Sequence, residues 1–190
     1  MVNVETLYDL FVYELEGIRS AESHLAELLA TLATDAEVDS LDDTPDSEFR
    51  DAARELFADH RERTDERVDR LGRAFDAIDH VATTTDRERD DLVVDALAQE
   101  KERFNNVVLD DALRNPYYLD AAIKAEQLVS QCYDSAFAVA EPLDVNDEVV
   151  DELEANRDDI ESTLRESRDL DESDDARSLL AHLADETPMD

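Results

Sequence analysis

The sequence predicts an all-α protein, an antiparallel bundle of about five long helices. Only two glycines and four prolines occur in 190 residues, so the chain offers few breaks in regular structure. Apolar residues recur with the helical period over long stretches. No stretch alternates β-branched and aromatic residues between turn signals, as a strand would. Long helices joined by short connections pack as an antiparallel bundle.

The first helix is expected over residues 4–33. At about 100° per residue, one face of "LYDLFVYELEGIRSAESHLAELLATL" is apolar and contains Leu7, Phe11, Ile18, Leu25, Leu29 and Leu32. Glu14 and Glu22 lie within about 40° of the centre of that face. A buried carboxylate costs several kcal/mol unless it is paired. Three explanations stay open: buried cations pair with these glutamates, a metal binds them, or the helix is less buried here.

The second helix is expected over residues 48–80, after an acidic loop in which Asp46 or Ser47 can serve as the N-cap. Arg67 lies on its inward face. That face otherwise consists of Ala53, Phe57, His60, Thr64, Val68, Leu71, Phe75 and Ile78. A third helix is expected over residues 87–109, beyond the break "ATTTD", with Glu100 on its inward face. Its inward apolar residues are expected to be Val93, Leu97, Phe104 and Val108.

The fourth helix is expected over residues 117–140, because Pro116 disfavours helix at the residue before it. Glu126 lies near the centre of its inward face, with Leu119, Ala122, Tyr133, Phe137 and Ala140. The fifth helix is expected over residues 147–167, and Arg157 shares a face with Val150, Leu153, Ile160 and Leu164. Residues 1–168 are therefore expected to form the bundle. Residues 169–190 are expected to form an acidic C-terminal tail with at most one short helix, at 176–184.

The charge of the chain is extreme. Fifty-three acidic residues against eighteen basic ones give a net charge of -35, and only Lys101 and Lys124 are lysines. Such self-repulsion destabilises a compact state in ordinary salt, but at molar salt the Debye length falls to about 3 Å. The composition therefore predicts a protein of a salt-accumulating halophile. It speaks against binding to nucleic acid or to an anionic membrane, both of which need basic surface.

The chain is also expected to be cytoplasmic. No apolar run approaches the roughly eighteen residues of a membrane span, and the N-terminus lacks the basic and apolar regions of a signal peptide.

Charged and polar side chains on the inward faces predict a polar interior. Bundle interiors that carry Glu and His from several helices are typical of di-iron and di-manganese proteins, with Glu-x-x-His on two of the helices. No Glu here is followed by His three residues later. Two interpretations follow. The first is a metal site made by Glu14, Glu22, His60, Glu100 and Glu126. The second is an ion-pair network in which Arg67 and Arg157 pair with these glutamates.

The opening helix resembles that of the YciE/YciF-type ferritin-like stress proteins, a family also catalogued as a domain of unknown function. The matching residues there are Leu7, Asp9, Leu10, Phe11, Glu14, Leu15, Ile18, Ala21, Glu22 and Leu25. Weaker matches follow at His60, Thr64, Arg70, Leu71, Phe75, Asp120, Ala121 and Ala122. The resemblance covers about residues 5–165. It implies a ferritin-like bundle and a homodimer, and it suggests metal or redox chemistry without establishing any, because fold is not function.

The chain departs from the family at the positions that would bind metal. Arg63 replaces the glutamate before Thr64, and Arg67 stands at a following His or Gln position. A Glu-His-x-Glu cluster of the fourth helix aligns with Ser130, Gln131 and Tyr133, and a glutamate position of the fifth helix holds Arg157. Losing carboxylates and gaining guanidinium groups disfavours a divalent metal.

The preferred hypothesis is a non-catalytic, stress-associated ferritin-like protein of a halophilic archaeon, with a degenerate metal site and no cofactor. The first alternative is a di-metal oxidase or peroxide-handling enzyme that uses Fe or Mn at Glu14, Glu22, His60, Glu100 and Glu126. The second alternative is a helical adaptor that uses its tail to bind a partner.

Overall fold

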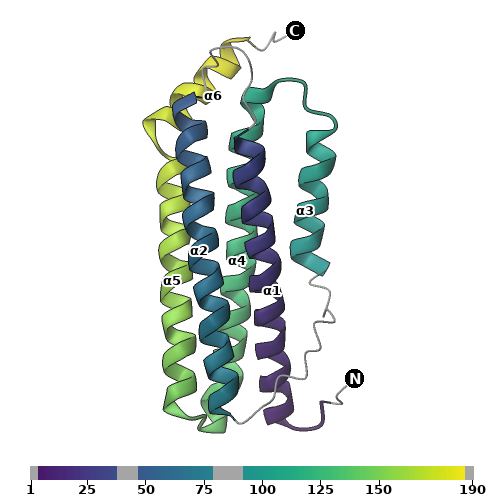
Figure 1. Cartoon of the computed structure of the whole chain (residues 1–190), viewed down its shortest axis with the longest axis vertical. Helices are drawn as coiled ribbons and strands as arrows, with labels where there is room; N and C mark the ends of the chain where they lie inside the picture. The colour runs from purple at the N-terminus through teal and green to yellow at the C-terminus, as the bar shows by residue number, and fades with distance from the viewer. Residues whose placement is uncertain (1–3, 38–46, 79–91, 187–190) are drawn as a thin grey trace.

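Four long helices form an antiparallel bundle (Figure 1). The computed structural model describes residues 4–37, 47–78 and 92–186. The long helices are α1 (Leu7–Ala36), α2 (Ser47–Ala77), α4 (Arg114–Ala140) and α5 (Asp147–Asp171). Each of α1 and α5 packs against both α2 and α4, and the neighbours run in opposite directions. All regular structure in the described residues is helical, which confirms the predicted fold class.

Helix α1 begins later and ends later than expected. Thr6 and Asp9 form a capping box at its start, in which the Asp9 backbone N–H donates to Thr6 Oγ1 at 3.1 Å and the Thr6 N–H donates to Asp9 Oδ2 at 2.8 Å. The helix continues through the stretch expected to open the loop and ends at Ala36, whose side chain is buried. In α2, Ser47 is the first helical residue rather than a cap, and Asp46 lies outside the described residues.

Helix α3 (Leu92–Asn105) packs beside α1 and α4 and carries the chain back along the bundle (Figure 1). It has 14 residues and ends four residues before the expected end at 109, and the expected start at 87 lies outside the described residues. Its expected orientation is right only in part, because Leu97 packs against the core as expected but the most deeply buried residues are others. Val94 and Lys101 are each 1% exposed, whereas Val93 is 51% exposed. The most buried residues thus follow the expected inward residues Val93 and Glu100 by one position each, which is a rotation of about 100°.

Buried Lys101 accounts for that rotation of α3. Its ammonium group lies 2.6 Å from Asp35 Oδ2 at the end of α1 and 2.6 Å from Glu102 Oε1. A lysine thus occupies the interface of α3 with α1. Its charge is compensated by the pairing that a buried ammonium requires.

The second half of the chain also differs from expectation at its helix ends. Helix α4 already begins at Arg114, so Pro116 lies inside its first turn, where the missing proline N–H costs nothing. Helix α5 continues past residue 168 to Asp171 and is followed by α6 (Asp174–Glu186). Ala176 and Leu179 of α6 join the hydrophobic core, so this segment packs on the bundle.

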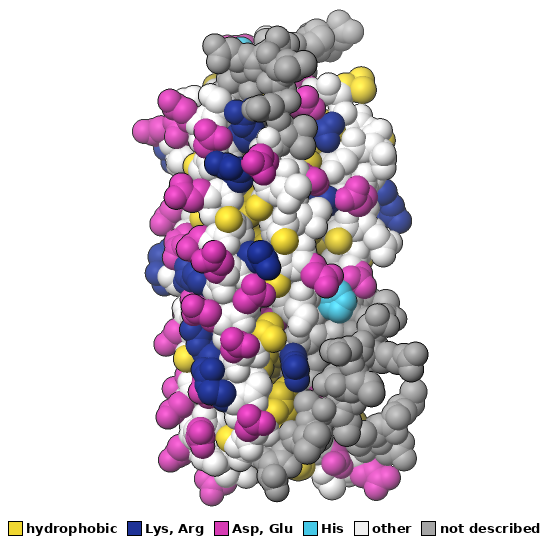
Figure 2. Space-filling view, in the orientation of Figure 1, with side chains coloured by type: hydrophobic (Ala, Val, Ile, Leu, Met, Phe, Trp, Pro, Cys, Tyr) yellow, Lys and Arg dark blue, Asp and Glu magenta, His cyan; other side chains and the backbone are white. Residues whose placement is uncertain are grey.

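The core lies between the four long helices, and the acidic residues cover the outside. Seven of the completely buried core residues are Phe11, Ile18, Leu25, Phe57, Leu71, Tyr133 and Ile160. Figure 2 shows Asp and Glu side chains over much of one face, with Lys and Arg side chains between them. None of the described helices combines the length and the apolarity that crossing a membrane would require.

Candidate functional site: a polar cluster inside the bundle

A completely buried arginine lies at the centre of the bundle interior. Arg67 of α2 donates from Nε to Glu22 Oε1 of α1 at 2.8 Å and from Nη1 to Asp159 Oδ2 of α5 at 3.1 Å. Its Nη2 donates to Thr64 Oγ1, one turn earlier in α2, at 2.7 Å. Burial, the largest single influence, lowers the pKa of the guanidinium, but Glu22, Tyr133 and Asp159 together raise it more, so the net shift is upward and Arg67 stays charged.

Tyr133 and Asn156 extend this cluster to the other two long helices. The Tyr133 hydroxyl of α4 donates to Glu22 Oε1 at 2.8 Å. The Asn156 side-chain amide of α5 donates to the Tyr133 hydroxyl oxygen and to the Arg67 backbone carbonyl, each at 3.0 Å. Burial raises the pKa of Tyr133 well above its ordinary value, which keeps the phenol protonated as a donor. All four long helices thus meet in one hydrogen-bonded unit.

Glu22 is held from two sides. Burial raises the pKa of the Glu22 carboxyl, and the Arg67 guanidinium and the Tyr133 hydroxyl oppose that shift. Both described partners contact Oε1, and Oε2 has no hydrogen-bond partner among the described residues. Since nearly all buried polar atoms in proteins are satisfied, this oxygen marks a point of incomplete pairing.

His60 and Glu126 form a second buried pair in the same interior. His60 Nδ1 lies 2.9 Å from Glu126 Oε1, and both side chains are completely buried. The hydroxyl of Ser167 donates to Glu126 Oε2 at 3.5 Å. The carboxylate therefore fixes the orientation of the imidazole, as carboxylates beside histidine commonly do.

Arg63 connects the interior to the seam between α2 and α5. It donates from Nε to Asp159 Oδ1 at 2.9 Å and from Nη1 to both oxygens of Glu166 at 3.0 Å. Partial burial raises the pKa of Glu166, but the hydrogen bonds from Arg63 and Ser162 outweigh it, and the net shift is downward. Two arginines of α2 thus share the Asp159 carboxylate.

The structure brings together four of the residues singled out in the sequence: Glu22, His60, Arg67 and Glu126. Glu14 is half-buried and makes none of the described contacts of this cluster. The inward placement of Glu100 is wrong. Its side chain is 56% exposed and pairs with Arg103 at 3.3 Å, because α3 is rotated to bury Lys101 instead.

The pairing of Arg157 with Glu14 or Glu22 is also wrong. Arg157 is half-buried, and its guanidinium lies over the ring of Phe137 at 4.5 Å from the ring centre. Its neighbour Asn156 takes the interior position. The side chains of neighbouring residues in a helix point about 100° apart, so an error in the assumed inward face can place the wrong one of two neighbours inside.

Asp159 and Asn156 are functional residues that the sequence reasoning missed. Their signal was present in the spacing, because Asn156, Asp159 and Thr163 follow one another at helical intervals on a face that also contains Ile160. Two of these polar residues have partners on α2: Asp159 accepts hydrogen bonds from Arg63 and Arg67. Asn156 accepts one from Arg70 and donates one to the Arg67 backbone carbonyl.

The interior residues do not fit a di-metal centre. Such a centre needs carboxylates from several helices around two adjacent ions with open positions. Here a guanidinium stands between the carboxylates of Glu22 and Asp159, and a second guanidinium binds the other oxygen of Asp159. A fixed positive charge at that position opposes divalent cations directly.

Three comparisons place the chain among known proteins. The model of the family described as "Domain of unknown function (DUF892)" matches residues 6–188. No curated protein matches the chain. Solved structures are also similar to the chain, and two of them are described next. YcfI from Rhodopseudomonas palustris has a TM-score of 0.70 and 18% sequence identity, with 87% of this chain and 95% of that chain covered. The E. coli stress protein YciF has a TM-score of 0.59 and 19% sequence identity, with 96% of this chain and 97% of that chain covered.

Proposed function

Because the chain belongs to the DUF892 family, we propose that it is a non-catalytic, stress-associated ferritin-like protein whose interior metal site has been replaced by a buried ion-pair network. The observation that carries the proposal is the position of Arg67. This completely buried guanidinium bonds to Glu22, Asp159 and Thr64 in the interior, where a ferritin-like enzyme would hold metal.

The replacement is electrostatically self-consistent. Glu22 and Asp159 require positive charge in the interior, and Arg67 and Arg63 supply it with directed hydrogen bonds. Unlike a metal ion, a guanidinium cannot be lost to a chelator, and it has no open coordination position for oxygen or peroxide. A protein built this way keeps its four helices joined when iron or manganese is scarce.

The association with stress rests on the likeness to YciF, which at 19% identity is a likeness of fold. The proposal includes a halophilic archaeal source, because a net charge of -35 is tolerated best where salt screens it. It also includes the cytoplasm as the location and, as the family resemblance implies, a homodimer as the assembly.

The test is metal loading of protein purified in molar KCl. Wild-type protein and Glu22→Gln would be loaded anaerobically with Fe²⁺ or Mn²⁺, desalted, and submitted to elemental analysis and to an oxygen-uptake assay. We expect no Glu22-dependent ion and no Fe²⁺ oxidation above that of the Glu22→Gln variant. Two ions per chain, retained in the control Glu152→Gln and lost in Glu22→Gln, would establish the di-metal enzyme instead.

A further inference from the structure

The second nitrogen of His60 is buried without a hydrogen bond to any residue that the structure describes. Glu126 accepts from Nδ1 at 2.9 Å, so in the neutral imidazole the proton lies on Nδ1 and Nε2 carries a lone pair. Nε2 has no hydrogen-bond partner among the described residues. It lies 3.5 Å from Oε2 of Glu166, so in the neutral imidazole a lone pair and a carboxylate oxygen face each other, whereas a protonated imidazole would form an ion pair there.

Two atoms of this kind repel unless a cation lies between them. Metal ligands bound at about 2.0–2.2 Å in a tetrahedral site lie about 3.5 Å from one another, which is the observed separation of Nε2 and Oε2. Asp59 completes the group. One ligand atom from each of Asp59, His60 and Glu166 lies within 4.8 Å of the other two.

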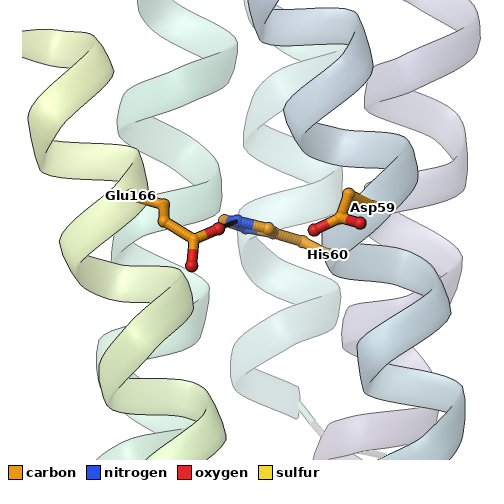
Figure 3. A group of neighbouring side chains, drawn as sticks. All are labelled: Asp59, His60 and Glu166. Carbon is orange, nitrogen blue, oxygen red and sulfur yellow. Dashed lines mark ion pairs between the residues drawn. The ribbon is translucent and has the colours of Figure 1, made fainter.

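We propose that Asp59, His60 and Glu166 form a mononuclear site for a divalent transition metal of the Zn²⁺ class at the seam between α2 and α5 (Figure 3). One imidazole nitrogen with two carboxylates suits Zn²⁺ or Co²⁺, whereas Mg²⁺ and Ca²⁺ prefer oxygen ligands alone. Asp59 is exposed and Glu166 is 41% exposed, so the remaining coordination position opens to solvent.

This seam site meets the interior cluster only at His60. Glu22 and Arg67 contribute no ligand atom to it, and Glu126 takes part only by holding Nδ1 of His60. A carboxylate on the other nitrogen is the usual support of a metal-binding histidine, because it fixes the tautomer and the ring orientation.

Arg63 competes with the metal for Glu166. Its Nη1 lies 3.0 Å from each oxygen of Glu166 and 3.8 Å from Asp59 Oδ2. Its Nε and Nη2 are held at the same time by Asp159. Binding of an ion therefore displaces one arm of Arg63 while the other remains anchored. Removing the guanidinium should therefore strengthen metal binding.

The experiment uses the full chain, stripped with a chelator and kept in molar KCl to suppress diffuse binding of cations. Co²⁺ is titrated while its visible absorption is followed, and Zn²⁺ is then added to displace it. The variants are Glu166→Gln, His60→Gln and Arg63→Gln, with Glu152→Gln as a control on the same pair of helices. Circular dichroism of each variant establishes that it is folded.

We expect one Co²⁺ per chain with the spectrum of a bound ion, displaced by Zn²⁺. Glu166→Gln and His60→Gln should weaken binding at least tenfold, the size of effect typical of losses around a metal site. Arg63→Gln should tighten binding, and Glu152→Gln should leave it unchanged. If His60→Gln does not fold, the Co²⁺ titration of Glu166→Gln is sufficient to test the site, because the Glu166 side chain is 41% exposed. No saturable binding, or binding that Glu166→Gln leaves unchanged, overturns the site. The proposed function has a test of its own: it fails if the chain binds a metal ion that is lost in Glu22→Gln.

Discussion

Arg67 Nε lies 2.8 Å from Glu22 Oε1, and both side chains are completely excluded from solvent. Burying two charges costs several kcal/mol per ion, and their attraction offsets that cost only when the remaining donors are also bonded. Arg67 meets this condition through Thr64 and Asp159, and Tyr133 adds a second donor to Glu22. The pair therefore joins α1 to α2 at one register, and removing either partner alone should be costly.

Replacing Arg67 should be strongly destabilising. We expect Arg67→Met to lower the free energy of unfolding by about 3–5 kcal/mol, because Glu22 and Asp159 lose their buried cation. The double variant Arg67→Met with Glu22→Leu should recover part of this loss. Chemical denaturation in molar KCl measures both.

Arg157→Met is the matched control for that experiment. This arginine contacts the ring of Phe137 rather than a buried carboxylate, so we expect a loss of only about 0.5–1 kcal/mol. Equal effects of the two arginine substitutions would contradict the central role given to Arg67.

The hydroxyl of Tyr133 should contribute to stability through two hydrogen bonds. Tyr133→Phe removes the donor to Glu22 and the acceptor for Asn156 without changing the ring. We expect a loss of about 1–3 kcal/mol, the cost of leaving buried partners unsatisfied. The comparison is again by denaturant unfolding. A variant as stable as the wild type would mean that water replaces the hydroxyl.

The pair of Arg73 and Glu152 on the seam between α2 and α5 predicts a pH dependence. The hydrogen bond from Arg73, at 2.6 Å, lowers the pKa of Glu152 below its ordinary value. The native state then binds fewer protons at this site than the unfolded state, whose pKa is about 4.3. The pair's contribution is therefore fully present above that value and is lost as the pH falls through the lower native pKa.

Glu152→Gln isolates this contribution. The difference in unfolding free energy between wild type and variant should be constant above about pH 5.5 and should shrink as the pH is lowered through about 4.3. A difference that stays constant down to about pH 3 would show that Arg73 does not shift this carboxyl.

Stability should rise with salt. The net charge of -35 is spread mainly over the surface, so screening lowers the self-repulsion of the folded state. We expect cooperative unfolding with a higher midpoint temperature at about 3 M than at about 0.1 M KCl, followed by circular dichroism. A midpoint that does not change across this range would remove the argument for a halophilic source.

The sequence was sufficient to predict the four long helices, because periodicity over 25 to 31 residues outweighs the uncertainty at any one position. The family resemblance read from the first helix is confirmed by the match over residues 6–188. Helix α3 shows the opposite case. With 14 residues and a buried lysine, its pattern supports two faces about equally well.

The sequence by itself determined that charged groups lie inside the bundle, since Glu22, His60, Arg67 and Glu126 fall near the centres of apolar faces on three long helices. Only the tertiary structure decided how those groups combine. In the structure Asn156 rather than Arg157 lies inside the bundle. Arg63 and Arg67 both donate hydrogen bonds to Asp159, and Nε2 of His60 lies opposite Glu166. The physical reason is that periodicity locates a side chain on its own helix to within about 100°. The rotation of each helix against its neighbours is set by packing of the whole core, and it decides which atoms come within hydrogen-bond distance.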